Sequence, residues 1–213
     1  MKIDLLAVTD KAESLIELAA RVCYRSQPSD QDGSADKLIR RLLAMGHESP
    51  LEHASATFQI QGCSRAMTHQ LVRHRMMSVS QQSQRYVAES CFDFVTPPAL
   101  PPAARAEYAR DMETIRAMYA KWKNQGLKNE DARFVLPNAC ATNIVITANF
   151  REFRHIFKLR CARNAQWEIR EACARMLRIL HRHAPAVFAD LLPLLDEQPD
   201  HPDGEAAAPP SHR

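Results

Sequence analysis

Residues 142–161 read TNIVITANFREFRHIFKLRC, and the stretch changes character at Asn149. The seven residues before it, Thr142–Ala148, are rich in β-branched side chains and predict a strand. Asparagine is a preferred helix cap, and residues 151–161 predict the helix that it would begin. A strand followed at once by a capped helix indicates a fold that combines a sheet with helices.

The same periodicities, followed along the chain, predict a mixed order of elements. Further strands are expected at residues 2–8, 54–60 and 92–95. Helices are expected from a cap at Thr9 or Asp10 to about residue 24, and at 34–45, 64–72, 103–124, 129–136 (with Asn129 as its cap) and 165–183. The order β-α-α-β-α-β-α-α-β-α-α predicts a single α+β domain over residues 1–195, with a mixed or antiparallel sheet flanked by helices. Residues 196–213, dominated by Asp, Pro, Gly and Ala, predict a disordered tail.

The composition is that of an ordinary soluble globular protein, with 46% hydrophobic and 25% charged residues. No apolar run approaches the length that crosses a membrane, and Asp4 and Asp10 argue against a secretory signal. The six cysteines form no CxxC pair, which favours reduced thiols. We therefore expect a cytoplasmic protein with no membrane partner.

Positive charge is concentrated locally, although the chain as a whole carries only +3. No Asp or Glu lies between Glu52 and Glu89, and the interval holds four arginines and three histidines: Arg65, Arg73, Arg75, Arg85, His53, His69 and His74. A second stretch, residues 133–163, has Glu152 as its single acid against six cations: Arg133, Arg151, Arg154, Lys158, Arg160 and Arg163. The two stretches predict one pocket for a polyanion. The alternative is that these arginines pair with acids of the long helix or of the tail.

Within the first stretch, residues 73–86 read RHRMMSVSQQSQRY. If the Arg73-His74-Arg75 triplet is extended, both guanidinium groups lie on one face and the imidazole on the other. If it is helical, the three side chains fan out, and the local sequence does not decide between the two. Glutamine side chains at positions 81, 82 and 84 carry donors and an acceptor, and could read the edge of a base. In the second stretch, Arg151, Arg154 and His155 are expected to share one face of the helix that Asn149 begins.

Several common sites are excluded. The five glycines form neither GxGxxG nor GxxxxGK[ST], so a phosphate loop of the glycine-rich kind is ruled out. The cationic stretches lack grouped carboxylates for Mg²⁺, and the histidines lack a partnering cysteine pair for zinc. We therefore expect no metal, and a nucleotide would have to be held by side chains and a helix end.

Residues 73–86 resemble the signature of the flavin-dependent thymidylate synthases, Arg-His-Arg-x-x-Ser-x-x-x-x-Ser-x-Arg-Tyr. The likeness extends to three further blocks in the same order: residues 47–53 (HESPLEH), 132–137 (ARFVLP), and Leu159-Arg160 followed by 165–169 (AQWEI). The four blocks are spread over more than half the chain.

The resemblance implies an α+β enzyme that methylates dUMP at uracil C5 to make dTMP. In the family, methylenetetrahydrofolate supplies the carbon, FAD carries the hydride, NADPH reduces the flavin, and a homotetramer builds its sites across subunits. A permanently charged guanidinium suits this chemistry, because it stabilises negative charge on the uracil ring without a proton shuttle.

Matched position by position, the resemblance assigns roles to individual residues. The dUMP site would comprise Gln70, Leu71, Val72, Arg73, Gln81, Gln82, Ser83, Gln84, Arg85, Arg133 and Arg160, with Arg160 against the uracil as the catalytic residue. The FAD site would comprise Ser55, Arg73, His74, Arg75, Gln81, Asn149, Phe150, Arg151 and His155. Two positions depart from the commonest pattern, since Ser80 replaces a frequent Asn and Gln81 a frequent Glu. Roles in chemistry for His53 and Ser83 stay open; Ser83 is treated as a ligand-binding hydroxyl.

Two other function classes remain as alternatives. Basic stretches with Gln and Ser also suit a nucleic-acid-binding module, although the small net charge and the scarcity of lysine argue against it, and we expect no nucleic-acid partner. The other alternative is a flavin-binding protein that has lost catalysis.

Overall fold

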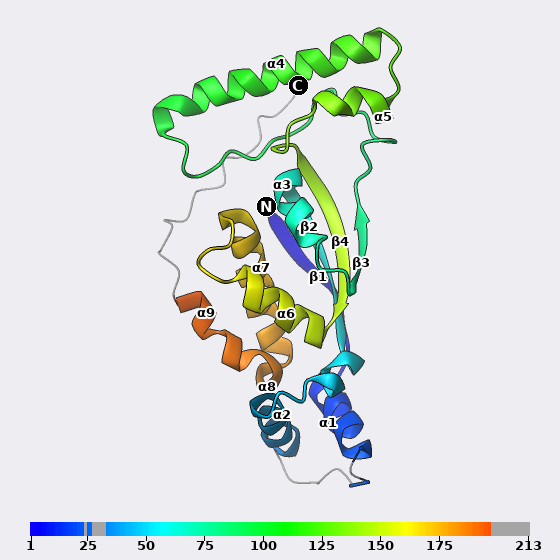
Figure 1. The fold of residues 1–213 in the computed structure, drawn as a ribbon, viewed down its shortest axis with the longest axis vertical. Coiled ribbons are helices and arrows are strands. Elements are labelled where there is room, and N and C mark those ends of the chain that lie inside the picture. Colours follow the sequence, from blue (N-terminus) through cyan, green and yellow to red (C-terminus); the bar gives the residue numbers. More distant parts are fainter. Residues whose placement is uncertain (24, 27–32, 197–213) are drawn as a thin grey trace.

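The sheet of this protein has four strands in the order β1-β2-β4-β3, and every neighbouring pair is antiparallel. The strands are β1 (Lys2–Val8), β2 (Ser55–Ser64), β3 (Met77–Gln81) and β4 (Ala141–Asn149). A computed structural model describes residues 1–23, 25–26 and 33–196 (Figure 1). Ile146 of β4 pairs with Phe58 of β2 on one side and with Val79 of β3 on the other, which sets the register of these three strands.

Helices account for most of the remaining described chain. The longer ones are α1 (Ala12–Val22), α2 (Ser34–Ala44), α3 (Arg65–Leu71), α4 (Arg105–Asn124), α6 (Phe150–Arg160) and α7 (Trp167–His183). Short ones are α5 (Asn129–Ala132), α8 (Pro185–Phe188), α9 (Pro193–Asp196) and four 3-10 turns, η1 (Ser49–His53), η2 (Pro102–Ala104), η3 (Arg133–Val135) and η4 (Ala189–Leu191). The α+β architecture with an antiparallel sheet and a single domain is confirmed.

The main core lies between the sheet and the helices that cover one of its faces. Alternate residues of β2 and β4, including the fully buried Phe58, Ile60 and Ile146, share one core cluster with residues of α6 and α7. Figure 1 shows these two helices against the sheet. Burying each such side chain contributes about 1.5–3 kcal/mol. The opposite face is more polar, as shown by the hydrogen bond of 2.9 Å between the hydroxyls of Thr57 and Thr147. The sheet is therefore a one-sided platform.

A smaller core attaches α4 to the end of the sheet where β4 begins. Phe92, Met112 and Cys140 form its centre, and Tyr108 packs against it while donating a hydrogen bond to the carbonyl of Val95. Figure 1 shows α4 lying across this end of the molecule, away from α6 and α7. The two ends of β4 thus meet different sets of helices.

Three helices begin with side-chain caps that hold site elements in place. The carboxamide of Asn149 accepts from the N–H of Glu152 at 2.8 Å, which confirms the expected cap of α6. Ser64 caps α3 by accepting from the N–H of Met67, and Gln166 caps α7. Ser64 in turn donates its hydroxyl to the buried carboxylate of Glu168, so the starts of α3 and α7 are joined. Such caps are each worth about 1 kcal/mol.

Some sequence-based boundaries were wrong. The third strand is Met77–Gln81; Phe92–Val95 makes only a single bridge, Phe94 to Cys140. Residues 77–81 carry three polar side chains, which hides an edge strand from a hydrophobic-pattern search. The cap positions of α1 and α5 are Lys11 and Lys128 instead of Thr9 or Asp10 and Asn129, and neither makes a side-chain capping bond. Asp196 ends α9, and the rest of the expected tail, residues 197–213, lies outside the described residues.

Candidate functional site

A cavity of about 420 Å³ opens at the N-terminal end of α6. It is lined by residues of the turn before and within η1, of the loop before β3, and of α6: Glu48, Glu52, Met76, Asn149, Arg151, Glu152, His155 and Lys158. Met76 follows the Arg-His-Arg triplet directly, so the cavity joins part of the first cationic stretch to the second. The sequence predicted a pocket formed by cations of both stretches, whereas the first stretch contributes Met76 to this lining and three carboxylates face the cavity as well.

The cations of the cavity are balanced by acids from η1 and the turn before it. Arg151 donates to Glu52, and the ammonium of Lys158 lies 2.9 Å from Glu48. Burial alone would raise the pKa of Glu48, but the hydrogen bond from Lys158 and the charge of Arg154 lower it below its ordinary value. The expected alternative, pairing with acids, therefore occurs, but with acids of the 47–53 block. In the described part of the chain, the long helix α4 does not supply them, and the tail lies outside the described residues.

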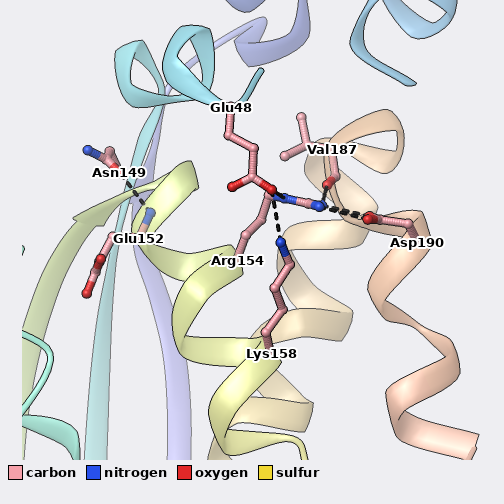
Figure 2. Close-up of polar contacts among 7 residues, drawn as sticks. All are labelled: Glu48, Asn149, Glu152, Arg154, Lys158, Val187 and Asp190. Atoms are coloured by element: carbon pink, nitrogen blue, oxygen red, sulfur yellow. Dashed lines mark hydrogen bonds and ion pairs between the residues drawn. The ribbon is translucent and has the colours of Figure 1, made fainter. Parts of the chain in front are cut away.

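Arg154 does not share the open face of α6 with Arg151 and His155, as was predicted. Its side chain is only 2% exposed and points toward Glu48, Val187 and Asp190 (Figure 2). It donates to both carboxylate oxygens of Asp190, at 2.6 and 2.7 Å, and to the carbonyl of Val187. Offset by three residues from Arg151, Arg154 sits at the border of the core-facing side, where η4 offers it a carboxylate. Arg154 therefore joins α6 to η4 inside the protein and is not one of the cations available to a ligand.

The Arg-His-Arg triplet is neither strand nor helix, yet its side chains separate as the extended alternative predicted. Arg73 and Arg75 are exposed, and His74 is buried. The Nε2 atom of His74 accepts a hydrogen bond of 3.0 Å from Nε of Arg160, and Nη2 of Arg160 donates to the carbonyl of Gln70. The ring of His155 packs edge-on against His74, with 5.7 Å between centroids. Arg160, the residue expected to be catalytic, therefore links the end of α6 to the triplet through His74 and to α3 through Gln70.

Burial, and then the charges of Arg160 and His155, lower the pKa of His74 from 6.5 to about 4. His74 is thus neutral at pH 7. In the unfolded chain it would take up a proton near pH 6.5, whereas in the folded chain it would do so only near pH 4. Folding stability tied to His74 is therefore present above pH 6.5 and is lost as the pH falls toward 4.

We expect this linkage to be measurable by urea unfolding between pH 7 and 4. Relative to His74→Phe, which cannot titrate, the unmutated protein should lose about 3 kcal/mol of unfolding free energy over that range. The difference between the two proteins isolates His74 from the carboxylates that also titrate there. Parallel pH curves for the two proteins would show that His74 is not held neutral by the fold.

A second group of expected site residues gathers at the other end of β4. The guanidinium of Arg85 lies 3.3 Å from the carboxylate of Glu130, and Arg133 donates to the carbonyl of the same residue. Gln82 pairs with Asn143, since its backbone N–H donates to the Asn143 carbonyl and its side chain accepts from the Asn143 amide. Arg85 and Arg133 thus meet at Glu130, and Gln82 lies three residues before Arg85 in the chain.

The two groups do not meet within one chain. Asn149 marks the position of the α6 cavity on β4, and Asn143 marks that of the group with Gln82, Arg85 and Arg133. Six residues of strand separate them, or roughly 20 Å at about 3.3 Å per residue. The cavity at the start of α6 and the Gln82 to Arg133 part of the dUMP set therefore lie toward opposite ends of β4. Within one copy of the described chain, roughly this length of strand lies between the α6 cavity and the Gln82 group.

Gln81 lies between the two groups and is held by two threonines. Its amide nitrogen donates to the hydroxyl of Thr68 at 2.9 Å and to that of Thr142 at 3.4 Å. With the nitrogen occupied, the amide oxygen is the atom left to accept a hydrogen bond from a ligand. This replacement of the commoner carboxylate keeps an acceptor and removes a charge.

Three expected ligand residues turn their side chains into the protein. Leu71 and Phe150 are fully buried, with Phe150 packed on Phe188 at 5.1 Å between ring centroids, and Gln84 is 9% exposed. Any contact of Leu71 or Phe150 with a ligand must come from the backbone. Among the others, Val72 is exposed, Ser83 is partly buried and accepts from the N–H of Arg85, and Ser55 opens β2.

Sequence reasoning missed several residues that shape these sites. Glu48, Glu52 and Met76 line the cavity without having been assigned a role, and Lys158 was counted only as one of the cations of the second stretch. Glu48 and Glu52 stand four residues apart inside the 47–53 block, and that spacing could have predicted two carboxylates facing one way. Thr68 and Thr142 carried no signal, because threonine is common in helices and strands alike.

Comparison with known proteins identifies the family of this chain. A family model described as thymidylate synthase complementing protein matches residues 4–186. The flavin-dependent thymidylate synthase of Geobacter sulfurreducens is 43% identical over 203 residues, covering 91% of this chain and 88% of that protein. The chain belongs to the flavin-dependent thymidylate synthase family. The enzyme of the same name from Nitratidesulfovibrio vulgaris is 43% identical over 209 residues, covering 88% of this chain and 85% of its own.

A solved member with a more distant sequence has the same fold. The crystal structure of thymidylate synthase X from Helicobacter pylori, with FAD and dUMP, matches 90% of this chain and 99% of its own, with a TM-score of 0.77 at 23% identity. In the part of the chain that the structure describes, no helix is long and apolar enough to cross a membrane.

Proposed function

We propose that this protein converts dUMP to dTMP by FAD-dependent reductive methylation, with 5,10-methylenetetrahydrofolate as carbon donor and NADPH as reductant. Family membership supports the overall reaction. The observation that carries the proposal is the contact between Arg160 and His74, which fixes a permanent positive charge between the two cationic stretches. The scattered, unpaired cysteines support a cytoplasmic location.

The residues around the α6 cavity fit an anionic cofactor such as FAD. The N-terminal end of an eleven-residue helix favours negative charge, and Arg151, His155 and Lys158 supply donors beside it. The ion pair of Arg151 with Glu52 does not prevent this, because both side chains are about half exposed and such pairs are worth about 0–1 kcal/mol. A phosphate can therefore displace Glu52 from Arg151 at little cost.

When bound, FAD would supply the redox chemistry, and the protein's own share is alignment and electrostatics. Arg151 and His155 would bind the cofactor, with Asn149 holding the helix end beside it. Arg160 would face the uracil, where its remaining N–H groups can stabilise negative charge on the ring. Gln81 would offer its amide oxygen, and Arg85 and Arg133 would bind the nucleotide phosphate.

We further propose that each site is shared between subunits of a homotetramer. The separation of the Arg151 group from the Arg85 and Arg133 group along β4 supports this, because a second copy can bring its own Arg85 end to the cavity of the first. The resemblance of the sequence to the family implies the same arrangement.

The reaction is tested by anaerobic release of tritium from dUMP labelled at C5. We expect a yellow protein that releases FAD on denaturation, and tritium release that requires the folate donor. Bound flavin without turnover, when dUMP, folate and NADPH are all supplied, would instead support a flavin-binding protein that has lost catalysis. A colourless preparation that cannot be reconstituted and binds oligonucleotides tightly at low salt would support the nucleic-acid-binding alternative.

Sharing of the site makes a separate prediction. Arg151→Ala and Arg85→Ala chains should each be nearly inactive alone, but equal mixing before assembly should restore roughly a quarter of the unmutated activity. The reason is that each site then draws one intact arginine from each of two randomly chosen chains. Activity of the mixture no higher than that of the separate variants would place both arginines in one chain's site and contradict the sharing.

A further inference from the structure

His74 lies behind Arg160, away from the exposed side where the triplet presents its two arginines. Its side chain is 4% exposed, and its Nε2 atom accepts from Nε of Arg160 at 3.0 Å. The second contact of Arg160, from Nη2 to the carbonyl of Gln70, is longer at 3.4 Å. Of the two hydrogen bonds that orient this guanidinium, the one to the imidazole is therefore the shorter.

The surroundings of His74 determine which ring nitrogen carries its proton. A nitrogen that accepts from a guanidinium cannot also be protonated, so the proton of the neutral ring must lie on Nδ1. Nδ1 faces the carboxylate of Glu152 at 3.9 Å, which favours a proton on that side. The edge of the His155 ring is the other titratable group against it. Arg160 and Glu152 thus favour the same tautomer.

This tautomer leaves a defined set of donors on Arg160. A guanidinium has five N–H groups, and in this arrangement one is given to His74 and one to Gln70. The three that remain belong to the two terminal nitrogens, which are the nitrogens able to bind a planar ligand in a fork. Without a partner at Nε, the guanidinium would keep only the longer contact to the Gln70 carbonyl, which fixes its orientation less well.

We infer that His74 is a positioning residue that orients Arg160 toward the substrate by accepting its Nε–H. The inference rests on the proposed function of Arg160 but concerns the geometry of its side chain, which can be measured without turnover. It assigns to His74 a role toward substrate activation in addition to its expected place beside the flavin.

Two substitutions separate this role from simple packing. His74→Phe preserves a buried planar ring but offers no acceptor, whereas the amide oxygen of His74→Gln can reach about the position of Nε2. We expect kcat to fall about 10²-fold in His74→Phe, the effect of a misplaced catalytic group, with FAD content and the KM for dUMP changed far less. We expect His74→Gln to recover most of the lost rate. His183→Gln, at the exposed end of α7, is the matched control and should behave as the unmutated protein.

Labelling with phenylglyoxal provides a readout that does not need activity. Peptide mass spectrometry would follow modification of Arg160 against the exposed Arg41 in the same sample. We expect labelling of Arg160 to rise several-fold in His74→Phe and to stay unchanged in His74→Gln. Equal labelling in all variants, or equal loss of rate in both His74 variants, would overturn the inference. If the unmutated protein released no tritium, the proposed reaction would fail, and the labelling alone would decide the role of His74.

Discussion

Replacing Arg160 by alanine is expected to lower the rate of dTMP formation by about 10²–10³-fold while leaving the fold intact. The reaction places negative charge on the uracil ring, and Arg160 is the cation expected to meet it. Its guanidinium is already oriented by His74 and Gln70, so little reorganisation is needed when that charge develops. Loss of one such donor costs about 2.7–4 kcal/mol of barrier.

The fold should tolerate this change because Arg160 is the last residue of α6 and is only partly buried. The hydrophobic anchors of the helix are elsewhere, at Phe153, Ile156 and Phe157, all fully buried. Thermal unfolding and FAD content are therefore expected to stay close to those of the unmutated protein.

Arg160→Lys and Arg41→Ala complete the comparison. Lysine retains the charge but cannot donate in a planar fork, so its rate should fall between those of arginine and alanine. Arg41, exposed near the end of α2, should be replaceable without loss of turnover. Near-normal tritium release by Arg160→Ala would remove Arg160 from the proposed chemistry.

The parts of the fold with local signals could be predicted from sequence. Strand β4, the Asn149 cap and helix α6 follow from β-branched periodicity, a capping amide and an amphipathic helix within one short stretch. Strand β3 could not be found this way. It pairs with β4 on one side only, and its exposed serines have no hydrophobic alternation to reveal them.

The positions of the charges could be predicted only in part. The sequence shows where cations are concentrated, but the acids that balance them come from residues about 100 positions away, as in the pairing of Arg151 with Glu52. Helical spacing alone placed Arg154 beside Arg151, whereas the tertiary structure captured it with Asp190. A periodicity analysis cannot decide on which side of such a border a long side chain will turn.

Replacing Asp190 by alanine is expected to lower the free energy of unfolding by about 3–5 kcal/mol, the cost of leaving a buried charge without its partner. Burial alone would lower the pKa of Arg154, and the hydrogen bonds and charge of Asp190 raise it again, so the arginine stays charged. Without Asp190, its guanidinium keeps only the carbonyl of Val187 and the carboxylate of Glu48, which lies 3.5 Å from Nε (Figure 2). Urea unfolding at pH 7 measures the effect.

Replacing Arg154 is expected to lower the free energy of unfolding less than replacing its smaller partner Asp190. Arg154→Met fills much of the same space with apolar atoms. The two carboxylates that lose their contact with Arg154 remain paired or hydrated. Glu48 keeps its pair with Lys158, and Asp190 is 49% exposed and can be hydrated. Arg154→Met should therefore destabilise less than Asp190→Ala, and adding Arg154→Met to Asp190→Ala should recover part of the lost stability.

Asp36→Ala is the matched control, because Asp36 pairs with Arg40 on the exposed side of α2, and it should change stability little. The test is which of the two substitutions, Arg154→Met or Asp190→Ala, destabilises the protein more. If Arg154→Met proved more damaging than Asp190→Ala, the arginine would act mainly by filling space between α6 and η4. The expected order would instead show that Arg154 is a buried charge that must be neutralised. Glu48 contributes to that neutralisation and also lines the proposed cofactor cavity.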